Sequence, residues 1–384
     1  MSRVISRSTR GRRVGFAWAM LAGAGLLVSC GKHGAYTQSH KDAAQQRQAQ
    51  IRAATDWDMA KQQYEGGDLE RALRTVDASI ASLGEVSKSH LLRGRILLEM
   101  GRLNDALPSF KRAIELDEAN AENYYYRAVA HERMSKRDEA LKDYRKAFEL
   151  KPDEPMYAIA AAEMLIEGGK LDAARSLLGG ESESLRYSPG VHQSLGHIAM
   201  MQKRTEEAVD HFAEASALGS QSPALLEDLA RAQIAAGRFS DAESTLARLS
   251  ALPDMSARRD LQHMHARCLL ELGRPVDARE ILLALTSDPA HANDVEAWLR
   301  MADVALILGD ERQLRTVADR LIAIAPDRAE GYMCLAMWQK RSGDLPAALR
   351  SAQRAVDRSE SGKAPAQLRD TIQKALASRG PASP

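Results

Sequence analysis

The sequence is poor in aromatic residues, proline and cysteine. Of its 384 residues only 5% are aromatic, 13 are proline and three are cysteine. An all-β fold is therefore not expected, because strands are enriched in aromatic and β-branched residues, whereas this chain is dominated by the helix formers Ala, Leu, Glu and Arg. With 45% hydrophobic and 27% charged residues the chain has enough apolar material for packed cores. The composition predicts a folded, all-α protein.

Basic charge is also scarce beyond the N-terminus. Five of the 53 Lys and Arg residues lie in the first 29 positions, which hold no acidic residue, so the remainder has 48 basic against 52 acidic residues and a net charge of about −4. Nucleic acid is not an expected partner, because its recognition depends on a basic surface.

The N-terminus has the layout of a secretory signal peptide. Residues 1–13 are basic, and the apolar run from Val14 to Val28 is fifteen residues long and broken only by glycine. A membrane-spanning helix needs about 20 apolar residues, so cleavage fits better than spanning. We predict a signal peptide over residues 1–29.

The end of this segment resembles the lipobox of bacterial lipoproteins. Leu27, Ser29 and Cys30 match that motif. The resemblance implies cleavage before Cys30 and acylation of Cys30, and Gly31, which stands where an inner-membrane retention Asp would lie, favours the outer membrane facing the periplasm of a Gram-negative-type bacterium. The alternative is an ordinary export signal that happens to contain a cysteine. Residues 30–52, polar and rich in glutamine, are expected to form a tether.

The rest of the chain repeats with a period near 34 residues. Six alanines are spaced 34 residues apart, and the series continues with Ala278, Leu314 and Ala348, so that each of nine units has one such position. A small residue stands twelve residues before each of these nine positions. Between the small residue and the repeated position lies a glycine in seven of the nine units, with Ser135 and Lys203 as the exceptions. The six alanines are Ala72, Ala106, Ala140, Ala174, Ala208 and Ala242, and the small residues are Ala60, Gly94, Ala128, Ala162, Gly196, Ala230, Ala266, Ala302 and Ala336. Each unit is predicted to be a helix, a tight turn and a second helix.

This pattern resembles the tetratricopeptide repeat. Residues 121–154 match it nearly throughout, at Tyr124, Ala128, Ala140, Tyr144, Ala147 and Pro152. The resemblance covers roughly residues 53–358 and implies a superhelical solenoid of about nine helix-turn-helix repeats, in which no unit has a core of its own and neighbours stabilise one another. A bulky residue four positions after the repeated alanine is expected to fill the space between units.

The resemblance also divides the chain. Units 1–4 would occupy residues 53–178 and units 5–9 residues 189–362, followed by a capping helix over residues 363–379. Gly179-Gly180 cuts the eighth helix short, so residues 179–188 form either a joint between two rigid halves or an ordinary loop after a short helix. Cys268 and Cys334 lie two repeats apart, about four helix layers of 8 to 10 Å, which is too far for a disulfide.

No motif for catalysis, nucleotide or metal is present. His192 and His197 are five residues apart and His263 and His265 two apart, which places each pair on different faces of a helix rather than at the ligand spacing of three or four. No phosphate-binding loop or nucleophile elbow occurs. We expect no enzyme activity, no metal and no cofactor.

A groove is the remaining candidate site. In the tetratricopeptide family ligands lie along first-helix residues at positions two, five, nine, twelve and thirteen of each unit. Carried over to this chain, these positions give an apolar series, most of it at positions five and twelve, and a polar series at position nine. The apolar series is Trp57, Tyr64, Leu91, Leu98, Tyr125, Ile159, Ile166, Met201, Ile234, Leu270, Leu299, Leu306 and Met333, and the polar series is Lys61, Arg95, Glu163, His197, Arg231, Arg267 and Asp303. Each apolar residue either anchors a partner or is covered by the adjacent helix and completes the stack.

These features predict a non-enzymatic scaffold or assembly adaptor, anchored in the bacterial envelope, that binds a peptide or helix of a partner protein in the groove. The asparagines of the family's carboxylate clamp are missing from the groove positions, so that mechanism is not expected. Lipid-anchored proteins with this repeat resemble pilus or secretion factors, polysaccharide-export subunits or adaptors of cell-wall hydrolases, and the sequence does not choose among them. The alternative is a glycan or small-molecule binder, or an enzyme with a site in the groove.

Overall fold

The computed structural model describes residues 35–180, 182–289, 291–359 and 362–378. The predicted signal peptide, Cys30 and the first residues of the tether lie outside these ranges. Within them the chain forms twenty helices and no strand, which confirms the all-α prediction.

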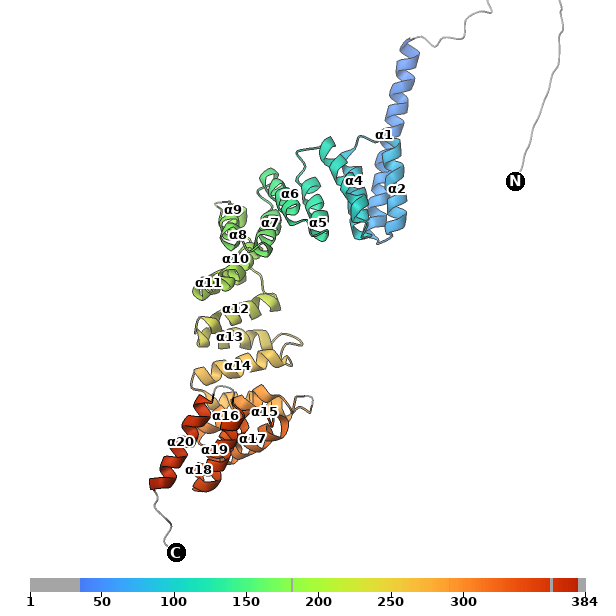
Figure 1. The fold of residues 1–384 in the computed structure, drawn as a ribbon. Helices are drawn as coiled ribbons and strands as arrows, with labels where there is room; N and C mark the ends of the chain where they lie inside the picture. Colours follow the sequence, from blue (N-terminus) through green and yellow to red (C-terminus); the bar gives the residue numbers. More distant parts are fainter. Residues whose placement is uncertain (1–34, 181, 290, 360–361, 379–384) are drawn as a thin grey trace, which may run out of the picture.

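Eighteen of the helices form nine pairs, each a first and a second helix joined by a tight turn. The pairs stack in sequence order into an elongated, curved array, and the N-terminal part of α1 projects beyond it (Figure 1). The pairs are α1 (Ala35–Glu65) with α2 (Leu69–Ser82), α3 (Ser87–Glu99) with α4 (Leu103–Leu116), α5 (Ala121–Arg133) with α6 (Arg137–Leu150), α7 (Pro155–Glu167) with α8 (Leu171–Leu178), α10 (Pro189–Met201) with α11 (Thr205–Ala217), α12 (Pro223–Ala235) with α13 (Phe239–Ser250), α14 (Arg259–Glu271) with α15 (Pro275–Ser287), α16 (Val295–Leu308) with α17 (Glu311–Ile324), and α18 (Ala329–Arg341) with α19 (Leu345–Asp357). A four-residue helix, α9 (Glu183–Arg186), separates the fourth and fifth pairs, and α20 (Lys363–Ser378) follows the last.

Within a pair, the small residue of the first helix faces a bulky residue of the second. A methyl group added at Gly94 would lie 2.4 Å from Cε1 of Phe110, and one at Gly196 would lie 2.6 Å from Cε1 of Phe212. Both phenylalanines are at most 1% exposed. Where the small residue is alanine, the opposing residue varies in size: Ala230 shares a buried cluster with Leu246, and Ala128 shares one with Tyr144. The two helices therefore approach as closely as the summed volume of this residue pair permits.

The turn inside each pair has one residue in the left-handed region. Seven are glycines, and the two exceptions found in the sequence, Ser135 and Lys203, have the same conformation, each with φ of 59°. At Gly101, with φ of 72°, an added Cβ would meet no atom within 4 Å, so the backbone conformation rather than crowding favours glycine there. The turn geometry thus stays constant even where the residue type does not.

The break after α8 is filled by packed structure. Leu185 of α9 is 1% exposed and belongs to one buried cluster with residues of α7, α8 and α10. The Ser184 hydroxyl donates to the carbonyl of Pro152 at 2.8 Å, and Nε2 of His192 lies 2.9 Å from the carbonyl oxygen of Arg186. Over the described residues, which do not include Glu181, the buried cluster thus runs from α8 through α9 to α10. The joint and the ordinary loop both stay predictions.

The C-terminal end is capped as predicted. Ile372 of α20 is fully buried in a cluster with Ala336, Leu345 and Ala352, so α20 covers the apolar face that the ninth pair would otherwise expose. The two cysteines in the array are free and buried, in agreement with the sequence prediction. Burial raises the pKa of Cys268 to about 11 and that of Cys334 to about 12, so both thiols stay protonated.

The steric pairing of Gly94 with Phe110 can be tested by a double-mutant cycle. Gly94→Ala should destabilise the chain by about 1 to 3 kcal/mol, because the new methyl group overfills the contact. Phe110→Leu in the same chain should relieve the clash, since Ala opposite Leu is the pairing already present in other units. Urea unfolding of the wild type, both single variants and the double variant measures the coupling. Strictly additive effects would contradict the pairing.

Candidate functional site

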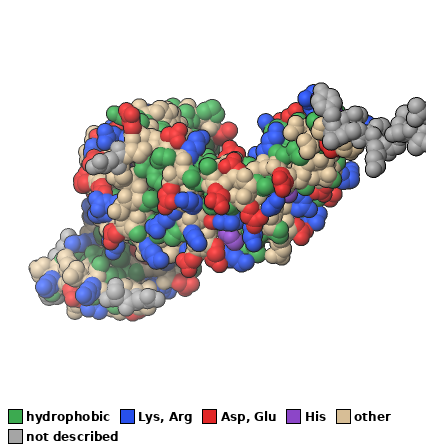
Figure 2. Space-filling view, turned by 90° about the horizontal axis from the view of Figure 1, so that it is seen from above, with side chains coloured by type: hydrophobic (Ala, Val, Ile, Leu, Met, Phe, Trp, Pro, Cys, Tyr) green, Lys and Arg blue, Asp and Glu red, His purple; other side chains and the backbone are tan. Residues whose placement is uncertain are grey.

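The candidate site is the first-helix face, which we define as the surface formed by positions two, five, nine, twelve and thirteen of the nine first helices. Successive first helices come into contact across the array, as α3 with α5 and α14 with α16. Seen from above, basic and acidic side chains are interspersed on the molecule, with apolar side chains between them (Figure 2).

The apolar series of this face belongs mostly to the stack. Leu91, Leu98 and Ile234 are 7%, 2% and 9% exposed and lie in buried clusters, so they are not available as anchors for a partner. Their clusters combine residues of their own unit and of neighbouring units, as expected for side chains that complete the stack. The other members are half-buried except Met201, which is 59% exposed. The half-buried members are Trp57, Tyr64, Tyr125, Ile159, Ile166, Leu270, Leu299, Leu306 and Met333.

The polar series is more accessible. Lys61, Glu163, His197, Arg231, Arg267 and Asp303 are exposed, and Arg95 is half-buried. Partial desolvation of the Glu163 carboxylate raises its pKa above the usual value, and the negative charges of Glu132 and Glu167 raise it further. The edge of the His197 ring contacts Phe212, and its Nε2 lies 3.2 Å from a carboxylate oxygen of Asp228. Charged side chains therefore form most of the exposed part of this face.

Two exposed apolar residues were missed by the sequence analysis. Met156, at position two of the fourth unit, is 44% exposed, and Ile307, at position thirteen of the eighth unit, is 61% exposed. Both positions belong to the family's groove set, so the repeat pattern contains the signal, but apart from Met201 the apolar series above consists of residues at positions five and twelve.

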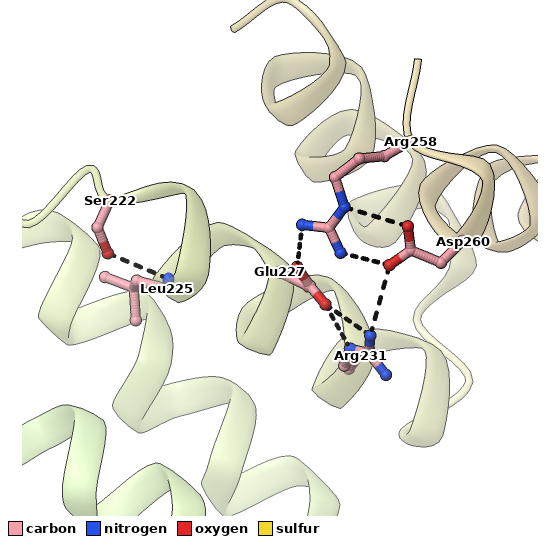
Figure 3. Close-up of polar contacts among 6 residues, drawn as sticks. All are labelled: Ser222, Leu225, Glu227, Arg231, Arg258 and Asp260. Atoms are coloured by element: carbon pink, nitrogen blue, oxygen red, sulfur yellow. Dashed lines mark hydrogen bonds and ion pairs between the residues drawn. The ribbon is translucent and has the colours of Figure 1, made fainter. Parts of the chain in front are cut away.

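A network of charged residues joins the sixth and seventh units (Figure 3). Arg258, just before α14, donates from Nη1 to Glu227 of α12 at 2.7 Å and also binds Asp260. Arg231 donates to the other oxygen of Glu227 at 2.5 Å and lies 3.9 Å from Asp260. Burial alone would raise the pKa of Glu227, but the hydrogen bonds from Arg258 and Arg231 outweigh it and hold this pKa below its usual value. In the same unit Ser222 caps α12 by accepting from the amide of Leu225 at 3.2 Å.

Similar contacts link other neighbouring units. Nε2 of His263 in α14 lies 2.8 Å from Asp294, which also caps α16 by accepting from the amide of Ala297. Asp228 of α12 accepts a hydrogen bond from the Gln193 side chain of α10 and lies 3.2 Å from Nε2 of His197 in the same helix. Because each contact crosses from one first helix to the start or middle of the next, these pairs fix how successive units are rotated against each other.

A hollow of about 340 Å³ opens on the first-helix face between α14 and α16. Its apolar lining is Leu270, Leu306 and Ile307, and its charged lining is Arg267, Glu271, Arg300 and Asp303. Arg267 has no ion pair or hydrogen bond among the described residues, and partial burial raises the pKa of Asp303 above its usual value. A second hollow, of about 310 Å³, lies between the third and fourth units and is lined by Glu132, Arg133, Ser135, Arg137, Met164 and Glu167.

The histidines are used in contacts between elements. His192 lies against His211, with the two Nδ1 atoms 3.2 Å apart, and His265 faces Glu243. In the described part of the chain no three His, Cys, Asp or Glu side chains are grouped so that they could hold a metal ion. None of the described helices has the length and apolar character needed to cross a membrane.

The network around Glu227 predicts a pH-dependent contribution to stability. Glu227→Gln should lower the free energy of unfolding at pH 7 by about 1 to 2 kcal/mol, because Arg231 and Arg258 lose a shared anion. Since folding lowers the pKa of Glu227, the wild type has this stabilisation above about pH 4.3 and loses it as the pH falls through the folded-state pKa. Urea unfolding at pH 7 and at low pH should show the difference between the two proteins shrinking with acid. Glu280→Gln, on the exposed surface of α15, is the matched control; an equal effect in both variants would contradict the network's role.

Comparison with known proteins agrees with this architecture. Tetratricopeptide repeat models match residues 121–154, 199–261 and 260–284, and a TPR repeat model matches residues 94–135. A segment covering 58% of this chain is 26% identical to DnaJ homolog subfamily C member 3 of Bos taurus, over 40% of that protein. A segment covering 36% of this chain is 29% identical to the protein O-mannosyl-transferase TMTC3 of Homo sapiens, over 16% of that protein. The chain thus spans less than half the length of these curated relatives.

Parts of this chain are also similar to several solved structures. PilF of Pseudomonas aeruginosa is 17% identical with a TM-score of 0.45, covering 56% of this chain and 97% of PilF. The type IV pilus biogenesis factor PilW is 18% identical with a TM-score of 0.45, covering 55% of this chain and 96% of PilW. MamA is 20% identical with a TM-score of 0.39, covering 43% of this chain and 91% of MamA. Taken with the helix pairs and their turns, the model matches show that this chain contains tetratricopeptide repeats, stacked in an all-α solenoid.

Proposed function

We propose that the chain is a non-enzymatic scaffold or assembly adaptor that binds a peptide or helix of a partner protein on its first-helix face. The observation that carries the proposal is the hollow between α14 and α16. Four of its lining residues, Arg267, Leu270, Asp303 and Leu306, stand at positions nine and twelve of adjacent units, where the repeat pattern alone placed the groove. A hollow lined by both apolar and charged side chains suits a peptide, which offers apolar side chains and polar backbone groups together.

We further propose that the protein is anchored through an acylated Cys30 in the outer membrane and faces the periplasm, where its partner belongs to an envelope complex. The support is the match of Leu27, Ser29 and Cys30 to the lipobox together with the form of α1. The first buried residue of α1 is Ala53, and its described residues before that are exposed or nearly so. Residues 35–52 would thus form a helical spacer of about 27 Å at 1.5 Å per residue. Such a spacer would hold the binding face at a set distance from the membrane and concentrate it near a membrane complex.

The binding face can be tested with exposed residues whose substitution leaves the stack intact. Met201→Asp combined with Ile307→Asp places two charges on the first-helix face, at side chains that are 59% and 61% exposed. We expect recovery of a membrane partner on affinity purification to fall at least about tenfold, while the unfolding free energy changes by less than about 1 kcal/mol.

The matched control is Val276→Asp with Leu283→Asp, which changes two side chains of similar exposure on the second helix α15. This control should retain the partner. If it loses the partner while the Met201 and Ile307 variant keeps it, the second-helix surface is the binding site and the proposal is wrong.

The anchor is tested by Cys30→Ser. Because Cys30 alone would supply the acyl attachment, the variant should incorporate no labelled palmitate in a Gram-negative host and should be lost from the outer-membrane fraction, whereas the wild type should incorporate the label and remain in that fraction. Cys268→Ser is the control and should label as the wild type does. Label retained by Cys30→Ser would contradict the lipoprotein assignment.

A further inference from the structure

A guanidinium lies between two tyrosine rings on the N-terminal part of the first-helix face. The central guanidinium carbon of Arg95 in α3 lies 5.2 Å from the ring centroid of Tyr64 in α1 and 4.6 Å from that of Tyr126 in α5. Three successive units each contribute one member of this sandwich. Stacking on aromatic faces holds a guanidinium plane in position and stabilises the cation.

The ring of Tyr126 is itself held in place. It stacks against Phe110 at 6.4 Å with an angle of 15° between the planes, and it meets Tyr125 edge-on at 5.2 Å. Phe110 is fully buried. The sandwich therefore rests on the close-packed core of the second unit, and the rotamer of Arg95 is restricted before any ligand binds.

Arg95 has no anionic partner in the part of the chain that the structure describes. Among the described residues no ion pair or hydrogen bond reaches its guanidinium, and its Nε is buried without an acceptor. Other arginines nearby are neutralised: Arg93 of the same helix binds Asp77 at 2.7 Å, and Arg133 lies 3.9 Å from Glu99. At the equivalent position nine of the sixth unit, Arg231 is bound to Glu227. A half-buried cation without an acceptor is unfavourable unless something else supplies one.

We propose that Arg95, held between Tyr64 and Tyr126, binds the side-chain carboxylate of an aspartate or glutamate in the partner segment. This inference rests on the proposed function and specifies the partner's chemistry. The planar donor edge of a guanidinium matches a carboxylate in a two-point hydrogen bond, and the restricted rotamer reduces the entropy lost on binding. The partner segment is thus acidic at one position, and it crosses α1, α3 and α5, the helices that contribute Tyr64, Arg95 and Tyr126.

The test uses a library of twelve-residue peptides displayed on phage and selected on the full chain in dodecyl maltoside. One enriched peptide and its acid-to-amide derivative are then synthesised and titrated against the wild type and against Arg95→Met, Arg95→Lys and Arg231→Met. We expect selection of an acidic residue, and at least about tenfold weaker binding of the amide derivative to the wild type. Arg95→Met should bind both peptides equally weakly. Arg95→Lys keeps the charge but loses the fork and should recover only part of the preference.

Arg231→Met is the matched control, because Arg231 occupies the same position of its unit but is already paired, and this variant should keep the preference for the acid. Melting curves of all variants show whether each is folded. If Arg95→Met does not fold, the comparison of the wild type with Arg95→Lys still tests the role of Arg95. Peptide binding without acid preference, or a preference that survives in Arg95→Met and Arg95→Lys, would overturn the role of Arg95 and leave the binding face standing. No enrichment over a column without protein would contradict both this inference and the proposed function.

Discussion

The whole array depends on one steric constraint, the contact between the small residue of each first helix and the bulky residue of its second helix. Gly94 with Phe110 and Gly196 with Phe212 are the extreme cases, because no Cβ fits against either ring. In the third unit Ala128 faces Tyr144, whose hydroxyl donates to Glu132 and so directs the ring toward the end of the first helix. In the eighth unit the second helix carries Ala318 instead of a bulky residue, and Leu314, Val317 and Met301 of the same unit fill the cluster. The eighth unit thus fills its core with other residues of the same two helices.

This constraint separates the functions of the two kinds of helix. The bulky side chains of the second helices pack against the first helices of their own units, and successive first helices contact one another, as α3 does α5, so that they form one face. Burial of Leu91, Leu98 and Ile234 shows that neighbouring first helices already use much of the apolar material on that face for stacking. What remains for a partner is a smaller set of exposed apolar residues among charged ones.

Charge pairing then distinguishes the two halves of the face. In the sixth to eighth units Glu227, Asp260 and Asp294 bind the basic groups around them, so these charges serve to fix successive units. In the first to third units the position-nine residue Arg95 is stacked on aromatic rings and left without an acid. Position nine thus holds an arginine paired with an acid in the sixth unit, Arg231, and an arginine stacked on two tyrosine rings in the second unit, Arg95.

The sequence predicted the elements that depend on residues close together in the chain. The 34-residue period predicted the nine helix pairs. It also predicted turns at Ser135 and Lys203, although neither is glycine, and both residues have the left-handed backbone conformation of the other turns. The capping helix followed from the need to cover the last apolar face. These features are set within a unit or by its immediate neighbour.

Features that depend on the rotation between units could not be predicted. Whether Leu98 or Ile234 is covered depends on how closely the next first helix lies, and the sandwich of Arg95 requires residues from three units to meet. Leu185 looked like part of a polar loop, since its sequence neighbours are Ser184 and Arg186, yet its side chain completes the core between α8 and α10. Local composition does not report such a contact between distant segments.

The central claim is that the nine pairs form a single continuous stack, so that the first-helix face is one surface rather than two. Native-state hydrogen exchange on the full chain tests it most directly, because amide protection reports local opening free energies along the array. The account predicts that α7, α8, α10 and α11, in the middle of the stack, are among the most protected helices and that protection declines toward α2 and α19. A minimum of protection at α8 to α10, with a separate maximum on each side, would show two independent halves and contradict the account.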